Sequence, residues 1–243
     1  MAIEIHPLEQ FQIERLIPIH IGRLDASYTN SALLMTIVVV LITALLLLGT
    51  RRRALVPGRW QSLAEMSYEF VADMIDTNVG HGGREFFPFI FTLFMFILFA
   101  NFLGMIPYSY TVTSQIVVTF ALAAVVFIGV TIIGIVRHGF RFLRLFVPQG
   151  VPAALLLLLV PIELLSYFIR PFTLAIRLFA NMLAGHTMLA IFAGFAASLG
   201  ILGILPLGVD ILLIALEVLV AALQAYVFAI LTCLYLSDAI HLH

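Results

Sequence analysis

Two very long apolar segments near the C-terminus limit what this chain can fold into. Residues 152–197 keep a helical pattern without a polar turn, and residues 206–237 do the same after the glycine-rich stretch 198–205. Helices of this length would reach about 69 Å and about 48 Å, whereas the apolar core of a bilayer is about 30 Å thick. We therefore predict two long, strongly tilted helices in a hairpin. Candidate sites for a kink or break in the first are Pro161, Pro171, Gly185 and Gly194.

Three further segments have the length of a membrane span, namely 29–50, 87–107 and 115–136, and no charged residue lies between Glu85 and Arg137. The chain is 63% hydrophobic and 10% charged, against about 45–50% and about 25% in soluble domains. These values exclude a water-soluble globule. The predicted fold class is all-α integral membrane, with about five membrane-crossing helices. The net charge of −1 gives no attraction to nucleic acid.

Residues 59–79 differ from the spans because acidic and apolar side chains alternate there. The apolar residues at helical spacing are Trp60, Leu63, Phe70, Val71 and Met74, and the acids on another side are Glu65, Glu69, Asp73 and Asp76. This pattern predicts a short amphipathic helix. A helix on the membrane surface and a solvated helix in a loop explain it equally well.

A polar segment, 1–28, precedes a single membrane domain, 29–243. The segment lacks the basic start and apolar stretch of a cleavable signal peptide. The loops after the first and third spans contain eight arginines, and the turn after the second span contains none. The eight are Arg51, Arg52, Arg53, Arg59, Arg84, Arg137, Arg141 and Arg144. The positive-inside rule places them in the cytoplasm or matrix, so we predict the N-terminus outside and the C-terminus inside.

The chain has one cysteine, Cys233, which cannot form an internal disulfide. Its apolar surroundings predict a small buried side chain. No Cys/His cluster in the sequence indicates a metal or a haem, so we expect no cofactor.

Six ionisable residues lie inside the predicted hairpin, where a charge costs about 2.5–3.5 kcal/mol on insertion scales. They are Glu163, Arg170, Arg177, His186, Asp210 and Glu217. Steps of seven residues, nearly two helical turns, place the first three on one helix face. The same step leads from Asp210 through Glu217 to Gln224, and Asn181 joins the first face. Because such residues usually mark a pathway, each helix is predicted to carry one polar stripe along it.

Several of these polar residues also have structural explanations. Arg170 fits a snorkelling side chain, and Asp210 fits a partner of the helix dipole. Asp238, which continues the register of the second helix, fits a solvated terminus, and His186 alone fits a hydrogen-bonded core histidine. Arg177 differs because no carboxylate lies three or four residues from it on either side.

The predicted topology assigns these residues to the two faces of the membrane. Glu163 lies near the cytoplasmic start of the first long helix, and His186 and Glu217 lie near the outer end of the hairpin. Polar groups therefore reach inward from both faces, with Arg177 between them. This arrangement predicts two offset half-channels separated by a fixed positive charge, and not a continuous pore.

Several motifs lie along this part of the chain. They are Pro161–Ser166, Leu174–His186 with its Arg177-Leu178-Phe179-Ala180-Asn181-Met182 core, Leu223–Phe228, Leu231-Thr232, Tyr235–Ser237 and, earlier, Asn101–Pro107. Together they resemble subunit a of F-type ATP synthases, and the resemblance covers nearly the whole chain from the first span onward. The polar N-terminal segment is similar to that of bacterial members. This similarity implies a bacterial inner (plasma) membrane, with the mitochondrial inner membrane as the alternative.

The resemblance implies roles in proton translocation. Arg177 resembles the family's essential arginine, which faces the rotor ring of subunit c. His186 and Glu217 resemble the inlet pair, and Glu163 resembles the carboxylate of the cytoplasmic half-channel. The polar neighbours of the arginine would be Asn181 and Gln224.

Two further residues, Arg170 and Asp210, are possible members of the pathway. Gly104 departs from the family pattern because some relatives carry an acid there, which leaves no inlet side chain at that position. The implied partners are the c-ring, the peripheral stalk subunit b, the lipid bilayer and protons. The implied subunit has no catalytic site of its own, although it is part of the proton-translocating ATP synthase.

Two other classes of protein fit parts of the pattern. A secondary transporter or channel would use Arg177 to bind an anionic substrate, but the sequence shows no inverted repeat that would favour it. A structural subunit of another respiratory complex would pair its buried charges internally.

Overall fold

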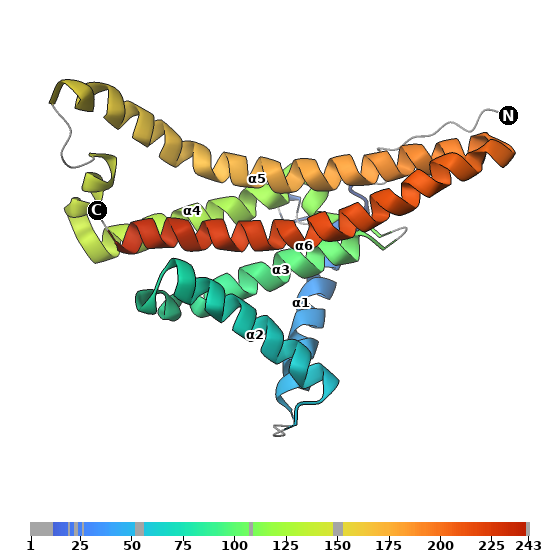
Figure 1. Ribbon diagram of the computed structural model, residues 1–243, viewed down its shortest axis with the longest axis horizontal. Coiled ribbons are helices and arrows are strands. Elements are labelled where there is room, and N and C mark those ends of the chain that lie inside the picture. The colour runs from blue at the N-terminus through green and yellow to red at the C-terminus, as the bar shows by residue number, and fades with distance from the viewer. Residues whose placement is uncertain are drawn as a thin grey trace.

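The computed structural model describes residues 12–18, 20–21, 24–25, 27–51, 56–106, 109–147 and 153–241, and these are almost wholly helical (Figure 1). The α-helices are α1 (Asn30–Thr50), α2 (Arg59–Asn78), α3 (Phe87–Gly104), α4 (Ile116–His138), α5 (Ala153–Ser198) and α6 (Ile204–Ile240). Short 3-10 segments between them are η2 (His81–Phe86), η3 (Val112–Ser114), η4 (Gly139–Phe146) and η5 (Gly200–Gly203). Near the N-terminus two antiparallel pairs form, β1 (Arg15–Ile17) with β4 (Tyr28–Thr29) and β2 (His20–Ile21) with β3 (Leu24–Asp25).

Five of the described helices are long and apolar enough to cross a membrane, namely α1, α3 with its preceding turn, α4, α5 and α6. The predicted all-α membrane fold is therefore confirmed. Residues 1–11 of the predicted polar segment lie outside the described residues, as do Arg52 and Arg53 of the first arginine loop.

Helix α5 runs without interruption past both of its prolines, Pro161 and Pro171. Each proline removes one backbone donor and normally kinks a helix, but neighbouring groups in membrane proteins often satisfy the freed carbonyl. Of the options predicted for this segment, a break is therefore wrong, and Figure 1 shows α5 as one curved helix. The turn to α6 is shorter than predicted, because α6 begins at Ile204. Gly200 has a φ of 60° there, a left-handed conformation that glycine adopts at little cost.

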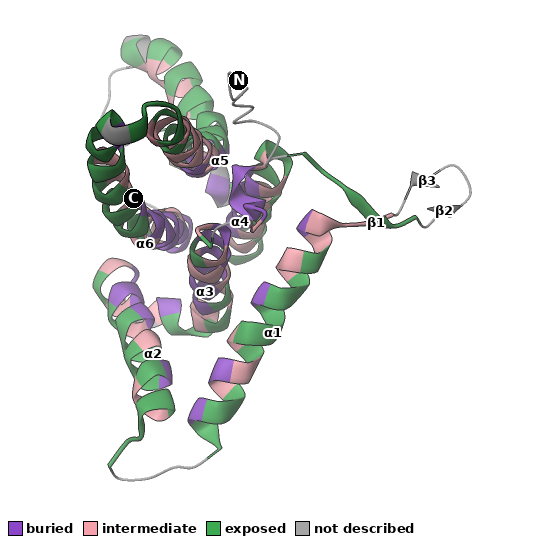
Figure 2. Cartoon of the chain, turned by 90° about the vertical axis from the view of Figure 1, so that its right-hand side faces the viewer, coloured by how far each residue is buried: buried purple, intermediate pink, exposed green. Residues whose placement is uncertain are grey.

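The core lies where α3, α4, α5 and α6 meet. Figure 2 shows buried surface on the inner faces of α3, α4 and α6, while much of α1 is exposed. Small residues such as Ala225 and Ala229 let α6 approach its neighbours, and both are fully buried. Asn101 on α3 is also fully buried and donates from Nδ2 to the backbone oxygen of Ala221 on α6 over 3.0 Å. This hydrogen bond ties the central helix to the C-terminal one. The predicted burial of Cys233 is confirmed.

Helix α2 begins and ends close to the predicted limits, but it divides its apolar residues between two surroundings. Val71 and Met74 are buried against the bundle, whereas Trp60 and Leu63 stay exposed. The exposed pair supports contact with lipid or with another subunit. A position of α2 on the membrane surface remains a prediction.

Candidate functional site

Arg177 lies near the middle of α5 on an exposed apolar surface. Its neighbours Phe172 and Ile176 are each 51% exposed, and Arg177 itself is exposed. Among the described residues, no ion pair or hydrogen bond involves the Arg177 side chain. The structure thus leaves this guanidinium facing outward from the chain, where an external anion has access to it.

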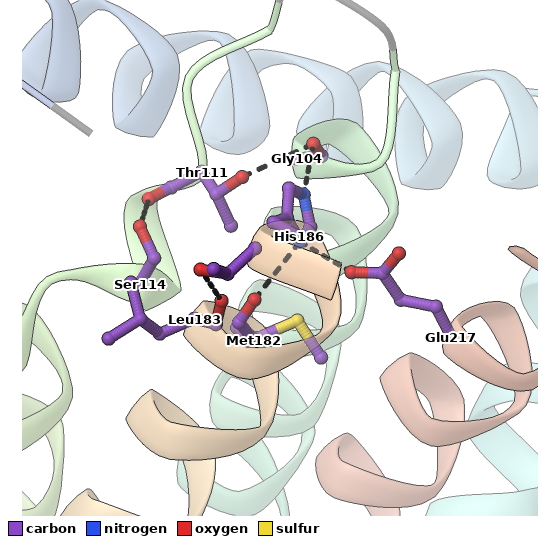
Figure 3. Close-up of polar contacts among 8 residues, drawn as sticks. Gly104, Thr111, Ser114, Met182, Leu183, His186 and Glu217 are labelled. Atoms are coloured by element: carbon purple, nitrogen blue, oxygen red, sulfur yellow. Dashed lines mark hydrogen bonds and ion pairs between the residues drawn. The ribbon is translucent and has the colours of Figure 1, made fainter. Parts of the chain in front are cut away.

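His186 and Glu217 meet between α5 and α6, as the sequence predicts. The Nδ1 atom of His186 pairs with Oε1 of Glu217, and the side chains are 10% and 5% exposed (Figure 3). Nδ1 also lies 3.1 Å from the backbone oxygen of Met182, and Nε2 lies 2.9 Å from that of Gly104. Helix α3 therefore supplies a third wall for this pair, through a backbone carbonyl.

The partners of His186 determine what the pair can do. A carbonyl oxygen can only accept a hydrogen bond, so Gly104 fixes a proton on Nε2. On its other side the ring faces Glu217, and the two groups can pass one proton between Nδ1 and Oε1. A buried and coupled imidazole and carboxylate take up and release protons as a pair. This geometry suits a group that loads protons one at a time.

The carboxylate of Glu217 lies directly on the backbone of α5. A Cβ added to Gly185 would approach Glu217 Oε1 to 2.7 Å. The next residue along α5 is His186, so a glycine at position 185 makes room for the ion pair. The sequence indicates only a possible kink at Gly185. It does not predict the contact with Glu217, because that contact depends on how the two helices pack.

At the opposite end of the hairpin, Arg170 bridges two carboxylates. Its Nη1 lies 3.0 Å from Asp238 Oδ2, and its Nη2 lies 3.9 Å from Glu163 Oε1. The guanidinium also lies over the rings of Tyr167 and Tyr235, at 5.8 Å and 5.1 Å from the ring centroids. Arg170 therefore has ion-pair partners beyond what a snorkelling side chain needs, and Asp238, 43% exposed near the end of α6, is both solvated and paired. The seven-residue register places these residues on the polar stripe of each helix, but it does not predict which of them pair.

The other predicted residues, Gln224, Asn181 and Asp210, form no hydrogen bond among the described residues with the His186–Glu217 pair or with Arg170 and its two carboxylates. Gln224 is buried on α6 and Asn181 is partly buried on α5. In the described part of the chain, no hydrogen bond joins either of them to Arg177. Asp210 lies two turns before Glu217, and its Oδ1 is buried without a hydrogen-bond partner among the described residues. The described residues include no group of three His, Cys, Asp or Glu side chains arranged to hold a metal ion.

A long helical hairpin with a His–Glu pair toward one end, partly buried charges toward the other, and an arginine between them that makes no ion pair with any described residue is typical of an ion-translocating membrane protein. Comparison with known proteins identifies which kind. A family model described as ATP synthase A chain matches residues 32–237. The chain is 59% identical to ATP synthase subunit a of Parvibaculum lavamentivorans, over 98% of this chain and 94% of that protein. It is 54% identical to ATP synthase subunit a of Paramagnetospirillum magneticum, over 98% and 99% of the two chains.

The chain belongs to the ATP synthase A chain family. The resemblance read from the motifs is confirmed, and with it a role in ATP synthesis and proton transport within the membrane sector of an F-type ATP synthase. The transporter and structural-subunit alternatives are not favoured.

Proposed function

We propose that this chain conducts protons through two half-channels that meet at Arg177. The observation that carries the proposal is the separation of three groups along one hairpin. The His186–Glu217 pair lies toward one end, the Glu163–Arg170 contact lies toward the other, and Arg177 lies exposed between them. Protons would enter beside the pair and leave beside Glu163.

The partner at Arg177 is proposed to be a ring of small helical subunits, each with one carboxylate in the membrane. A proton from the His186–Glu217 pair neutralises one ring carboxylate, which can then turn toward lipid. Arg177 stabilises the next carboxylate as an anion and blocks direct passage to the other half-channel. Arginine suits this role because it stays protonated in proteins, so it does not relay the proton itself. The driving force is about 2.3 kcal/mol per charge for each 100 mV.

The exposed apolar surface of the hairpin that carries Arg177 supports this ring as the partner. Large apolar side chains on α5 and α6 remain exposed, among them Ile211, Leu212, Leu216 and Leu219 on α6. A ring surface of apolar helices would cover them, and its carboxylates would provide the counter-charge that Arg177 lacks among the described residues. If the tagged chain is purified from membranes, a ring-forming two-helix protein with one mid-membrane carboxylate should accompany it. Its absence from an otherwise intact complex would exclude the proposed partner.

A second partner is proposed on the other side of the molecule. Helix α1 exposes apolar residues such as Val40 and Leu47, at 59% and 65%. The exposed residues Trp60 and Leu63 of α2 continue this surface beyond the membrane span. A single membrane helix of the peripheral stalk subunit b, together with lipid, would cover it.

The sidedness of the chain is proposed from its arginines, with the N-terminus outside and the C-terminus in the cytoplasm of a bacterial cell. In a Cys233→Ala background, cysteines at Ser27 and Ser109 should react with an impermeant thiol reagent added from outside. Cysteines at Gln61 and His241 should react only after the inner face is opened to the reagent. Labelling of Ser27 and His241 from the same side would exclude five crossings.

A methyl group at position 185 should impair proton transport without unfolding the protein. In Gly185→Ala the new Cβ meets the flexible end of Glu217, so the carboxylate moves away from His186 and the helices stay in place. We expect ATP-driven proton pumping to fall about tenfold, the size of a lost charge-assisted hydrogen bond. Gly208→Ala is the matched control, because no atom lies within 4 Å of a Cβ added there. Equal pumping by both variants would show that Gly185 does not support the pair.

A further inference from the structure

The part of the α3–α4 turn that leads into α4 is buried, although it only joins two helices. Residues Tyr110 through Ser114 are all buried, and Thr113 has no exposed surface. The segment η3 packs against α1, α3, α4 and α5. Turns usually run over the surface, because their polar groups need water. This one carries four hydroxyl groups into the bundle, those of Tyr110, Thr111, Thr113 and Ser114.

One backbone carbonyl connects this turn to the ion pair. The oxygen of Gly104 lies 2.9 Å from His186 Nε2, and it also accepts a hydrogen bond from Thr111 Oγ1 at 3.3 Å (Figure 3). Ser114 Oγ in turn donates to the backbone oxygen of Thr111 over 2.6 Å. A Cβ at Gly104 would lie 2.8 Å from Thr111 Cγ2, so this close approach needs a glycine. Some relatives carry an acid at position 104. In this chain the position instead holds a hydrogen-bonded backbone carbonyl.

Among the buried oxygens of these segments that have no hydrogen-bond partner in the described part of the chain, two lie close in sequence to the residues just described. They are Thr113 Oγ1, two residues beyond Thr111, and Asn101 Oδ1, one turn before Gly104. The other end of the Asn101 amide binds Ala221, one turn beyond Glu217. Buried polar atoms are nearly always hydrogen-bonded, and proteins commonly complete such sites with ordered water. Both oxygens thus mark places for water in α3 and η3. Helix α3 contacts His186 through Gly104, and it contacts α6 near Glu217 through Asn101.

We propose that the α3–α4 turn forms a wall of the inlet half-channel, in which Thr113 and Asn101 hold the water that brings protons to the His186–Glu217 pair. Thr111 is a positioning residue that acts through Gly104. Its hydroxyl fixes the carbonyl that keeps Nε2 protonated, and this leaves Nδ1 directed at Glu217. This inference rests on the proposed function, because it names further residues of the same inlet. Protons move along this water to the pair, where an N–H or O–H bond forms as the O–H bond of the donating water breaks.

The test removes one hydroxyl at a time with little change of shape. Thr113→Val deletes the oxygen that would hold water. We expect the outer proton concentration needed for half-maximal ATP synthesis to rise about fivefold, the effect of one lost hydrogen bond, with the maximal rate unchanged. Thr111→Val should raise that concentration as well, and Thr111→Ser should restore it. The rates are measured in reconstituted vesicles at a fixed membrane potential and are normalised to the assembled complex.

A threonine of α5 is the matched control. Thr187 Oγ1 donates to Leu183 O over 2.7 Å inside its own helix, so Thr187→Val should leave the proton dependence unchanged. An unchanged proton dependence in both Thr113→Val and Thr111→Val would overturn the inference, because the turn would then only pack. The proposed function would still stand if Arg177→Ala stopped pumping in the same assay. Continued pumping by Arg177→Ala would instead refute the function, whatever the turn variants do.

Discussion

Arg177→Ala is expected to abolish ATP-driven proton pumping while the complex still assembles. In the described structure this side chain is exposed and makes no ion pair. Its removal therefore does not leave a buried carboxylate unpaired. The expected loss is therefore functional, since the other arginine of α5, Arg170, is already paired with Glu163 and Asp238. Pumping is measured in vesicles that contain equal amounts of assembled complex.

Two further variants make this result specific. Arg177→Lys keeps a positive charge but should also fail, because a desolvated ammonium group can lose its proton. Arg84→Ala removes the same type of side chain from an exposed ion pair with Asp76, and such pairs contribute at most about 1 kcal/mol. It should pump normally. Pumping at the wild-type rate by either Arg177 variant would refute the barrier role.

The helices and their hairpin follow from the sequence because lipid imposes simple rules. A span must be long and apolar, and every backbone group inside it must be hydrogen-bonded, which selects helices. The limits of α1, α2 and α4 therefore lie within about two residues of those predicted, as boundaries set by composition usually do. The heptad steps along α5 and α6 likewise predict which ionisable residues share a face.

Contacts between segments far apart in the chain could not be predicted from the sequence. Tyr110–Ser114 has the composition of a surface turn, and only the packing of η3 against four helices brings the Thr111 hydroxyl to the Gly104 carbonyl that contacts His186. The Arg170–Asp238 ion pair joins residues 68 positions apart. The fit of Glu217 over Gly185 depends on the distance between two helix axes. Each of these features depends on how the helices cross, which hydrophobic periodicity does not specify.

The pairing of His186 with Glu217 predicts strongly non-additive mutational effects. Because the two groups are buried in contact, removing either one leaves the other without its partner in an apolar site, which costs about 3–5 kcal/mol for a buried pair. Each single substitution, His186→Ala or Glu217→Gln, should therefore reduce pumping at least about a hundredfold. The double variant should be little worse than either, since the pair is already lost.

The exchange His186→Glu with Glu217→His gives the sharper outcome. It keeps an imidazole and a carboxyl group together, so it should pump faster than either single replacement. It should still pump more slowly than the wild type, because a glutamate at position 186 would face the carbonyls of Met182 and Gly104, which now bind imidazole nitrogens. Two carbonyls repel a carboxylate, whereas the Gly104 carbonyl accepts a hydrogen bond from the imidazole Nε2. If instead the losses of the two single exchanges simply added across the neutral pH range, His186 and Glu217 would be independent residues, and the inlet pair would not exist.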